Sequence, residues 1–115
     1  MTKFQIVHNP RCSKSRDALA ILKEHGIEPE IIEYLNGGLN RELLLKIIET
    51  LNIHPKEMVR TKEEEFQALK IDLNNSQDVI KALLDHPKLL ERPIVLKGNK
   101  AVIGRPPENV LSLID

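Results

Sequence analysis

The fold is decided near the amino terminus, by the stretch Phe4-Gln5-Ile6-Val7-His8-Asn9-Pro10-Arg11-Cys12-Ser13-Lys14-Ser15-Arg16. Its first four residues read as a short strand, and residues 13–25 carry apolar side chains at helical spacing up to a stop at Gly26. A second apolar run, residues 30–34, predicts another strand. A strand, a helix and a strand within this length form a βαβ unit, whose two strands are parallel and joined by a right-handed crossover.

The middle of the chain is helical and rich in charge. Asn40 is expected to cap one helix, and Asn75 precedes the start of another. Thr61 and Glu64, three positions apart, predict the capping box of a helix between these two. The middle of the chain therefore reads as several short helices without a strand.

The carboxyl-terminal part reads as two strands and a helix. Residues 93–96 and 101–103 flank Gly98-Asn99, a two-residue loop of the kind that closes β-hairpins. Pro106-Pro107 predicts the start of a last helix, whose expected inward-facing residues are Val110, Leu111 and Ile114.

In this order the elements predict an α/β protein in which a βαβ half is followed by a ββα half. That is the layout of a thioredoxin-like fold with a mixed four-stranded sheet. We expect one such domain over residues 1–115, with a helical insertion at approximately residues 37–90.

Composition narrows the function classes. A content of 41% hydrophobic and 30% charged residues is globular, and the 17 basic residues balance 17 acidic ones. Neither this neutral charge nor the 3% of aromatic residues indicates a nucleic-acid partner. We expect no signal peptide, because the amino-terminal residues include no long apolar region, and no apolar stretch approaches the roughly 20 residues of a membrane helix. Because a lone cysteine forms no internal disulfide, we expect a cytoplasmic protein, and we expect a monomer without membrane partners.

Cys12 is the single cysteine and lies where the first strand passes into the first helix. The unpaired N–H groups and the positive dipole end of a helix amino terminus stabilise a thiolate, and the same N–H groups hold oxyanions. Arg16 adds positive charge, the Ser15 hydroxyl can donate to a thiolate, and His8 adds charge or orients the loop. A buried structural cysteine is the competing interpretation, which this cationic junction disfavours.

Two other cysteine motifs are absent. A low-molecular-weight phosphatase loop has five residues between Cys and Arg, whereas three separate Cys12 from Arg16. A thioredoxin-type Cys-x-x-Cys pair is excluded because position 15 is serine. Without a resolving cysteine, an adduct at Cys12 must be released by an external thiol.

The segment resembles the glutaredoxin-dependent arsenate reductase family, or ArsC-like proteins, whose motif runs His-Asn-Pro-x-Cys-x-x-Ser-Arg. The matching residues are His8, Asn9, Pro10, Cys12, Ser15 and Arg16. The form around the cysteine looks like the family's short-chain branch. Three later segments resemble the family's downstream arginine motifs: Val59-Arg60-Thr61-Lys62, Glu91-Arg92-Pro93-Ile94-Val95 and Gly104-Arg105-Pro106.

The resemblance implies that Cys12 attacks arsenate, that glutathione is a co-substrate and glutaredoxin a partner, and that no cofactor or metal is bound. It implies that Arg60, Arg92 and Arg105 bind the oxyanion, and that Pro93 is a cis-proline near the site. Guanidinium groups suit this role because they stay charged and pair with oxyanion oxygens through two hydrogen bonds. Any one of these arginines taken alone would be interpreted as an exposed residue in a salt bridge. Because all three lie in segments that match the family's motifs, an anion site is the favoured interpretation.

Two alternatives remain open. Spx-type transcriptional regulators share the fold and bind RNA polymerase, but they commonly carry Cys-x-x-Cys, which Ser15 disfavours. A glutathione-dependent thiol oxidoreductase with another substrate would need the same reactive Cys12.

Overall fold

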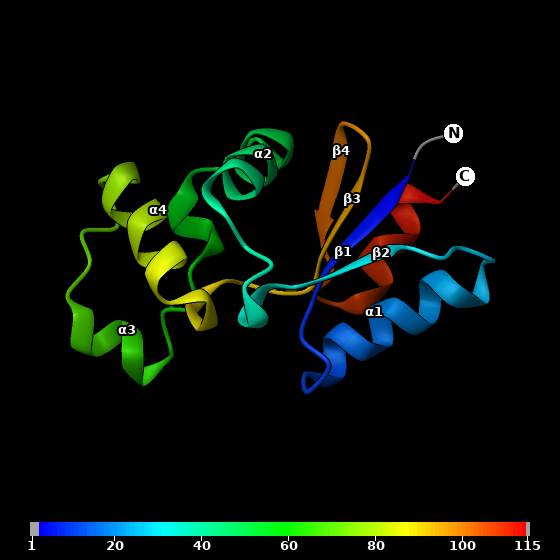
Figure 1. Cartoon of the computed structure of the whole chain (residues 1–115), viewed down its shortest axis with the longest axis horizontal. Coiled ribbons are helices and arrows are strands. Elements are labelled where there is room, and N and C mark those ends of the chain that lie inside the picture. Colours follow the sequence, from blue (N-terminus) through cyan, green and yellow to red (C-terminus); the bar gives the residue numbers. More distant parts are fainter. Residues whose placement is uncertain (1–2, 115) are drawn as a thin grey trace. The chain divides into compact units, whose positions relative to one another are not determined.

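The computed structural model describes residues 3–114, and its helices and strands appear in Figure 1. The strands are β1 (Phe4–His8), β2 (Glu30–Glu33), β3 (Ile94–Lys97) and β4 (Lys100–Ile103). The α-helices are α1 (Ser13–Glu24), α2 (Arg41–Leu51), α3 (Glu64–Leu69) and α4 (Ser76–Asp85). Four 3₁₀ segments connect or end them: η1 (Tyr34–Asn36), η2 (Pro55–Met58), η3 (Pro87–Leu89) and η4 (Pro107–Leu113).

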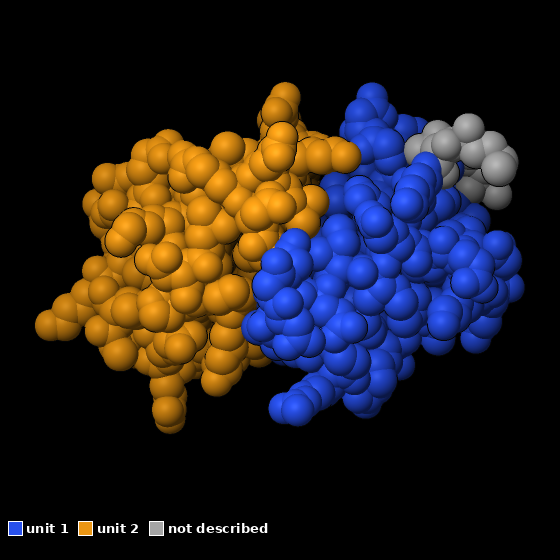
Figure 2. All heavy atoms as spheres, in the orientation of Figure 1, with its two compact units in different colours: residues 1–38, 92–115 blue, residues 39–91 orange. Residues whose placement is uncertain are grey.

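The chain divides into two compact units, coloured separately in Figure 2. Unit 1 comprises residues 1–38 and 92–115 and contains the sheet, α1 and η4. Unit 2 comprises residues 39–91 and contains α2, α3 and α4 without a strand among its named elements. Within the described residues, no helix is long and apolar enough to cross a membrane.

Unit 1 is built on a mixed sheet of four strands in the order β2-β1-β3-β4. β1 and β2 are parallel, which confirms the predicted βαβ unit, whereas β3 is antiparallel to both β1 and β4. Gly98 has a φ of 60°, and this left-handed conformation allows the two-residue hairpin between β3 and β4. The α/β, thioredoxin-like fold expected from the sequence is confirmed.

One face of this sheet is covered by α1 and η4. Ile6 of β1 and Val95 of β3 are register partners and lie in one buried cluster. They pack there with Ala18 and Leu22 of α1 and with Val110 of η4. Because α1 is held by this core, the residues at its amino terminus are placed at the end of β1.

The ends of β3 and β4 pack together at Pro93 and Gly104. The N–H of Gly104 donates to the carbonyl of Pro93 over 2.8 Å. A Cβ at Gly104 would lie 2.9 Å from Cγ of Pro93, so only glycine permits this approach. The Arg92-Pro93 and Arg105-Pro106 peptide bonds are both cis. The contact places the segments that carry Arg92 and Arg105 side by side.

Unit 2 is a small helical body in which α4 packs against α2, η2 and η3. The predicted caps at Asn40 and Asn75 are confirmed, because each side chain accepts a hydrogen bond from the first turn of its helix. The predicted capping box at Thr61 is wrong. The helix α3 begins only at Glu64, and Glu63 caps it without a side-chain hydrogen bond.

The last predicted helix is a 3₁₀ segment, η4, rather than an α-helix. Its buried residues are Pro107, Val110 and Leu113, spaced by three, and three residues per turn place them on one side. Leu111, expected to face inward, is exposed instead. Val110 is buried as predicted, and Ile114 packs against the core cluster. Only the expectation for Leu111 was wrong: Leu113 takes the inward position, because the segment is a 3₁₀ helix rather than an α-helix.

Candidate active site

Cys12 lies at the N-cap of α1, directly after the loop that follows β1. Its N–H donates to the carbonyl of Asn9 over 3.0 Å, and its own carbonyl accepts from the N–H of Arg16 over 3.0 Å. The side chain is half-buried and closes no cap hydrogen bond. The thiol is therefore placed beside the unpaired N–H groups of the first turn, as the strand-to-helix junction predicts.

The pKa of Cys12 is lowered from that of a free thiol. Burial acts to raise the pKa, but it is outweighed by the backbone N–H of Ser15, the charge of Arg92, the N–H of Lys14 and the charge of Arg105. The amino terminus of α1 and two arginines distant in sequence therefore both lower the pKa of the thiol. A lowered pKa increases the thiolate fraction at neutral pH, which is the reactive form.

Ser15 does not use its hydroxyl as the sequence suggests. The side chain is buried, and its Oγ lies 2.6 Å from Nδ1 of His8. The same Oγ accepts the N–H of Asn9 over 3.0 Å. The hydroxyl therefore ties α1 to the end of β1, while the backbone N–H of Ser15 acts on the Cys12 thiolate.

His8 is buried at the end of β1, and its pKa is lowered. Burial is the main cause; the charge of Glu33 acts to raise the pKa, and those of Arg16 and Lys23 to lower it. A histidine with a lowered pKa is neutral at neutral pH. In this structure His8 therefore orients the loop through Ser15, the second of the two roles considered from the sequence.

Arg16 is exposed, and its Nη1 donates to the carbonyl of Pro10 over 3.0 Å. This bond closes the loop before Cys12 against the first turn of α1. The arginine charges that lower the Cys12 pKa come from Arg92 and Arg105.

Arg92 carries unused hydrogen-bond donors. Its Nε and Nη1 are buried and have no hydrogen-bond partner within the described residues 3–114. Buried donors without a partner cost free energy, so they favour binding of an acceptor. Together with its effect on Cys12, this makes Arg92 the strongest candidate for an anion ligand in unit 1.

Arg60 belongs to unit 2, where carboxylates surround it. Its Nη2 lies 2.9 Å from Glu63 Oε1 and its Nε lies 3.9 Å from Glu91 Oε1. The anion-binding role of Arg60 stays a prediction. An anion would compete there with these two carboxylates.

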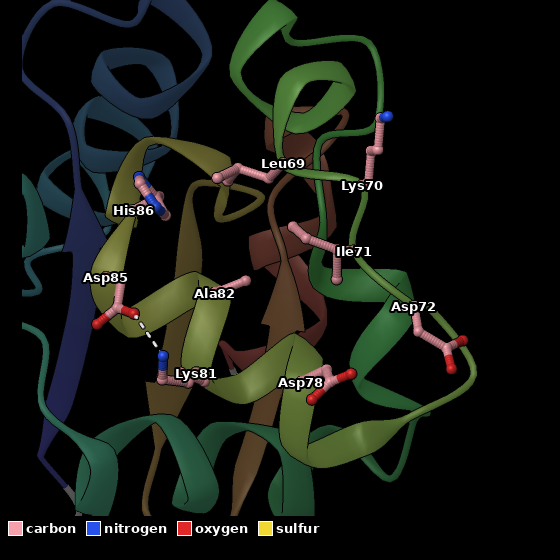
Figure 3. A pocket seen from close by; sticks show the side chains of 9 residues that line it. All are labelled: Leu69, Lys70, Ile71, Asp72, Asp78, Lys81, Ala82, Asp85 and His86. Atoms are coloured by element: carbon pink, nitrogen blue, oxygen red, sulfur yellow. Dashed lines mark ion pairs between the residues drawn. The ribbon is translucent and has the colours of Figure 1, made fainter.

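A hollow of about 390 Å³ in unit 2, shown in Figure 3, has mixed walls. Leu69 and Ile71 supply apolar surface, and Lys81 and Asp85 of α4 form a 3.6 Å ion pair at its side. None of the predicted site residues lines this hollow. In the described part of the chain, no cluster of three or more His, Cys, Asp or Glu side chains is arranged to hold a metal ion.

Comparison with known proteins shows which family the chain belongs to. The sequence profile of the ArsC family matches residues 7–113. This chain belongs to the ArsC family. It is 46% identical over 112 residues to an arsenate reductase of Haemophilus influenzae, covering 95% of this chain and 97% of that protein. It is 45% identical over 118 residues to the uncharacterized protein YfgD of Escherichia coli K12, covering 99% of both.

A solved structure shows the same fold. The arsenate reductase from Vibrio cholerae is 41% identical, covers 98% of both chains and superposes with a TM-score of 0.89. The family resemblance drawn from the four motifs is confirmed. The ArsC-family fold accounts for the thioredoxin-like sheet of unit 1.

Two further residues near this loop have effects that were not assigned to them from the sequence. Glu33 is the register partner of His8 across the parallel strands and acts on its pKa. Asn9 uses its Oδ1 to accept the N–H of Arg11 over 3.0 Å and so shapes the loop. Glu33 could have been found from the sequence, because the carboxyl ends of the two strands in a βαβ unit meet at one edge.

The lowered pKa of Cys12 predicts how the reactivity of this thiol depends on pH. The rate of Cys12 alkylation by iodoacetamide should rise with pH at a midpoint below the value of about 8.5 for a free thiol. Stopped-flow measurement from low to high pH gives the midpoint. The same chain unfolded in urea is the control, and its midpoint should lie higher because the helix terminus and the arginines no longer act on the sulfur. Equal midpoints in the two states would contradict the activation of Cys12.

Proposed function

We propose that this protein is an arsenate reductase that uses glutathione and glutaredoxin. The observation that carries the proposal is the position of Cys12, whose pKa is lowered by the first turn of α1 and by Arg92 and Arg105. A reactive sulfur and guanidinium groups whose charges act on it suit a small oxyanion. The names of the relatives from Haemophilus influenzae and Vibrio cholerae support arsenate as that oxyanion.

In the proposed first step, the Cys12 thiolate attacks the arsenic of arsenate. A sulfur–arsenic bond forms and one oxygen leaves as water after protonation. Arg92 is suited to hold the anionic adduct, because its buried Nε and Nη1 have no acceptor within the described residues. Arg105 adds charge to the same region, and Arg60 is proposed as a third ligand.

External thiols supply the electrons in the proposed cycle. Cys12 is the only cysteine of the chain, so no internal disulfide can form. A glutathione thiolate attacks the Cys12 sulfur of the adduct; the sulfur–arsenic bond breaks, its electron pair goes to arsenic, and a Cys12–glutathione disulfide forms. Glutaredoxin thiols then reduce this disulfide and restore the Cys12 thiolate. Over the whole cycle As(V) gains two electrons, two thiols are oxidised to one disulfide, and arsenite leaves. No bound cofactor is required, and the reduced thiol pool of the cytoplasm is the proposed setting.

His8, Ser15 and Arg16 are proposed to position the nucleophile. Ser15 joins His8 to α1, and Arg16 holds the loop through the Pro10 carbonyl. All proposed groups come from one chain, so the enzyme is proposed to act as a monomer. Pro93 follows Arg92 and packs against Gly104, the residue before Arg105. We therefore propose that Pro93 helps to position these two arginines.

The test is a coupled assay on the wild-type protein. Arsenite formation is measured with arsenate and glutathione, with and without glutaredoxin, and with a thioredoxin system in place of both. We expect arsenite only when glutathione is present, and faster turnover when glutaredoxin is added, because Cys12 has no resolving partner.

Three other outcomes of these measurements would each reject the proposal or favour an alternative function. No arsenite from a coupling system that works with another arsenate reductase would reject the arsenate assignment. Reduction of glutathione mixed disulfides without arsenate turnover would favour a thiol oxidoreductase. Specific capture of RNA polymerase by a protein inactive in both assays would favour a Spx-type regulator.

A further inference from the structure

A cavity of about 300 Å³ lies in unit 1, beside the loop that leads to Cys12. It is lined by residues 8–11, by Glu33 at the end of β2, and by Leu35 and Asn36 of η1. This volume is at the lower end of the range for small-molecule sites. Neither Arg92 nor Arg105 lines the cavity, so it is separate from the arginines proposed to hold arsenate.

The cavity offers one cation and one carboxylate that are not paired with each other. The Arg11 guanidinium is exposed and forms no hydrogen bond or ion pair with any residue the structure describes. Glu33 accepts the side-chain amide of Asn36 at Oε1 over 3.0 Å, while its Oε2 has no such partner among residues 3–114. Opposite charges that line one cavity without a salt bridge suit a ligand that carries both an ammonium and a carboxylate.

The cavity lies within reach of the nucleophile. Arg11 directly precedes Cys12, and the Cys12 N–H is bonded to the carbonyl of Asn9, which also lines the cavity. Consecutive Cα atoms lie about 3.8 Å apart, and an extended tripeptide spans roughly 10 Å. Cys12 itself does not line the cavity, but it directly follows Arg11, and a tripeptide is long enough to extend beyond the cavity toward this neighbouring residue.

We propose that this cavity is the binding site of the thiol donor, a zwitterionic peptide thiol of the glutathione type. Arg11 binds a carboxylate of the donor, and Glu33 binds its ammonium through the unused Oε2. The donor's role in arsenate reduction rests on the proposed function. Binding of the peptide in the cavity does not, and it can be tested without arsenate.

Equilibrium binding is tested with S-methylglutathione, which keeps the charges of glutathione but lacks a reactive thiol. Titration into ¹⁵N-labelled wild-type protein should shift the amides of residues 9, 11, 33 and 36 together, along one saturating curve. Shifts confined to other regions, or no saturating shifts, would overturn the proposal.

Reactivity is tested by disulfide exchange at Cys12. The Cys12 thiolate attacks oxidised glutathione, the Cys12–glutathione disulfide forms, and one glutathione thiolate leaves. Arg11→Ala and Glu33→Gln should each slow this reaction about tenfold, the effect of one lost charge-assisted contact. The same variants should react with uncharged 2-hydroxyethyl disulfide at the wild-type rate, because that reagent has no groups for Arg11 or Glu33.

Glu30→Gln is the matched control, since Glu30 is an exposed glutamate of the same strand and does not line this cavity. It should leave both rates unchanged. Equal slowing with both disulfides, or no slowing with oxidised glutathione, would overturn the proposed site. If the charge-dependent pattern holds while the wild-type protein forms no arsenite, the proposed function falls and the peptide-thiol site stands.

Discussion

Replacement of Cys12 by serine should reduce arsenite formation by at least about 10³-fold, as losses of a catalytic nucleophile do. The sulfur has two tasks in the proposed cycle, attack on arsenic and oxidation to a disulfide. A serine hydroxyl is not ionised at neutral pH and cannot form a disulfide, so it fails at both. No other cysteine in the chain can replace it.

The measurement is arsenite release by the Cys12→Ser variant and the wild type at equal concentration in the glutathione and glutaredoxin assay. Ser13→Ala is the matched control, because Ser13 is the exposed neighbour of Cys12 and has no part in the proposed machinery. It should retain most of the activity. Thermal unfolding of each variant checks the fold. A Cys12→Ser protein that keeps a tenth of the wild-type rate would exclude Cys12 as the nucleophile.

The second large effect is expected at Arg92. Arg92→Gln should lower kcat/KM for arsenate by about 10²- to 10³-fold, the cost of removing one preorganised donor from a developing anion. The Arg92 Nε and Nη1 are already buried without an acceptor among the described residues, so no local bond must break before they bind oxygen. Arg92→Lys should recover only part of the loss, because an ammonium lacks the planar pair of donors.

A second measurement separates a site role of Arg92 from a purely structural one. Because the Arg92 charge lowers the pKa of Cys12, Arg92→Gln should move the alkylation midpoint of Cys12 to higher pH. Arg41→Gln is the control, since Arg41 is bonded to Gln77 within unit 2 and belongs to no proposed site. If Arg92→Gln and Arg41→Gln gave the same small loss and the same midpoint, Arg92 would not be an anion ligand.

The behaviour of Arg60 is harder to anticipate than that of Arg92. Both arginines stand in matching family motifs, and their sequences do not distinguish them. In the structure Arg60 is bound by Glu63 and Glu91, whereas Arg92 has buried donors without partners in residues 3–114. Anion binding at Arg60 therefore competes with existing ion pairs. The Glu91 carboxylate could not be assigned to Arg60 beforehand, because it lies far from Arg60 in the chain, whereas Glu63 is only three residues away.

Errors in the predicted elements have a common origin. The capping box at Thr61 and the inward position of Leu111 were both inferred from spacing within a few residues. In the structure, α3 begins only at Glu64. The segment η4 is a 3₁₀ helix with three residues per turn, so Val110 and Leu113 are the residues that contact the core. Short segments have weak intrinsic preferences, and tertiary packing decides among them.

The position of Cys12 could be predicted without tertiary information. Cys12 follows a strand and opens a helix, and both elements are specified by neighbouring residues, so its place at the N-cap of α1 was predictable from local pattern. The order of elements likewise predicted the parallel β1–β2 pair and the β3–β4 hairpin. The environment of the sulfur depends instead on residues distant in sequence. Arg92 and Arg105 reach it because β3 and β4 continue the sheet beside β1 and Gly104 admits Pro93. Sheet register and close packing set such distances, and neither is a property of any short segment of the chain.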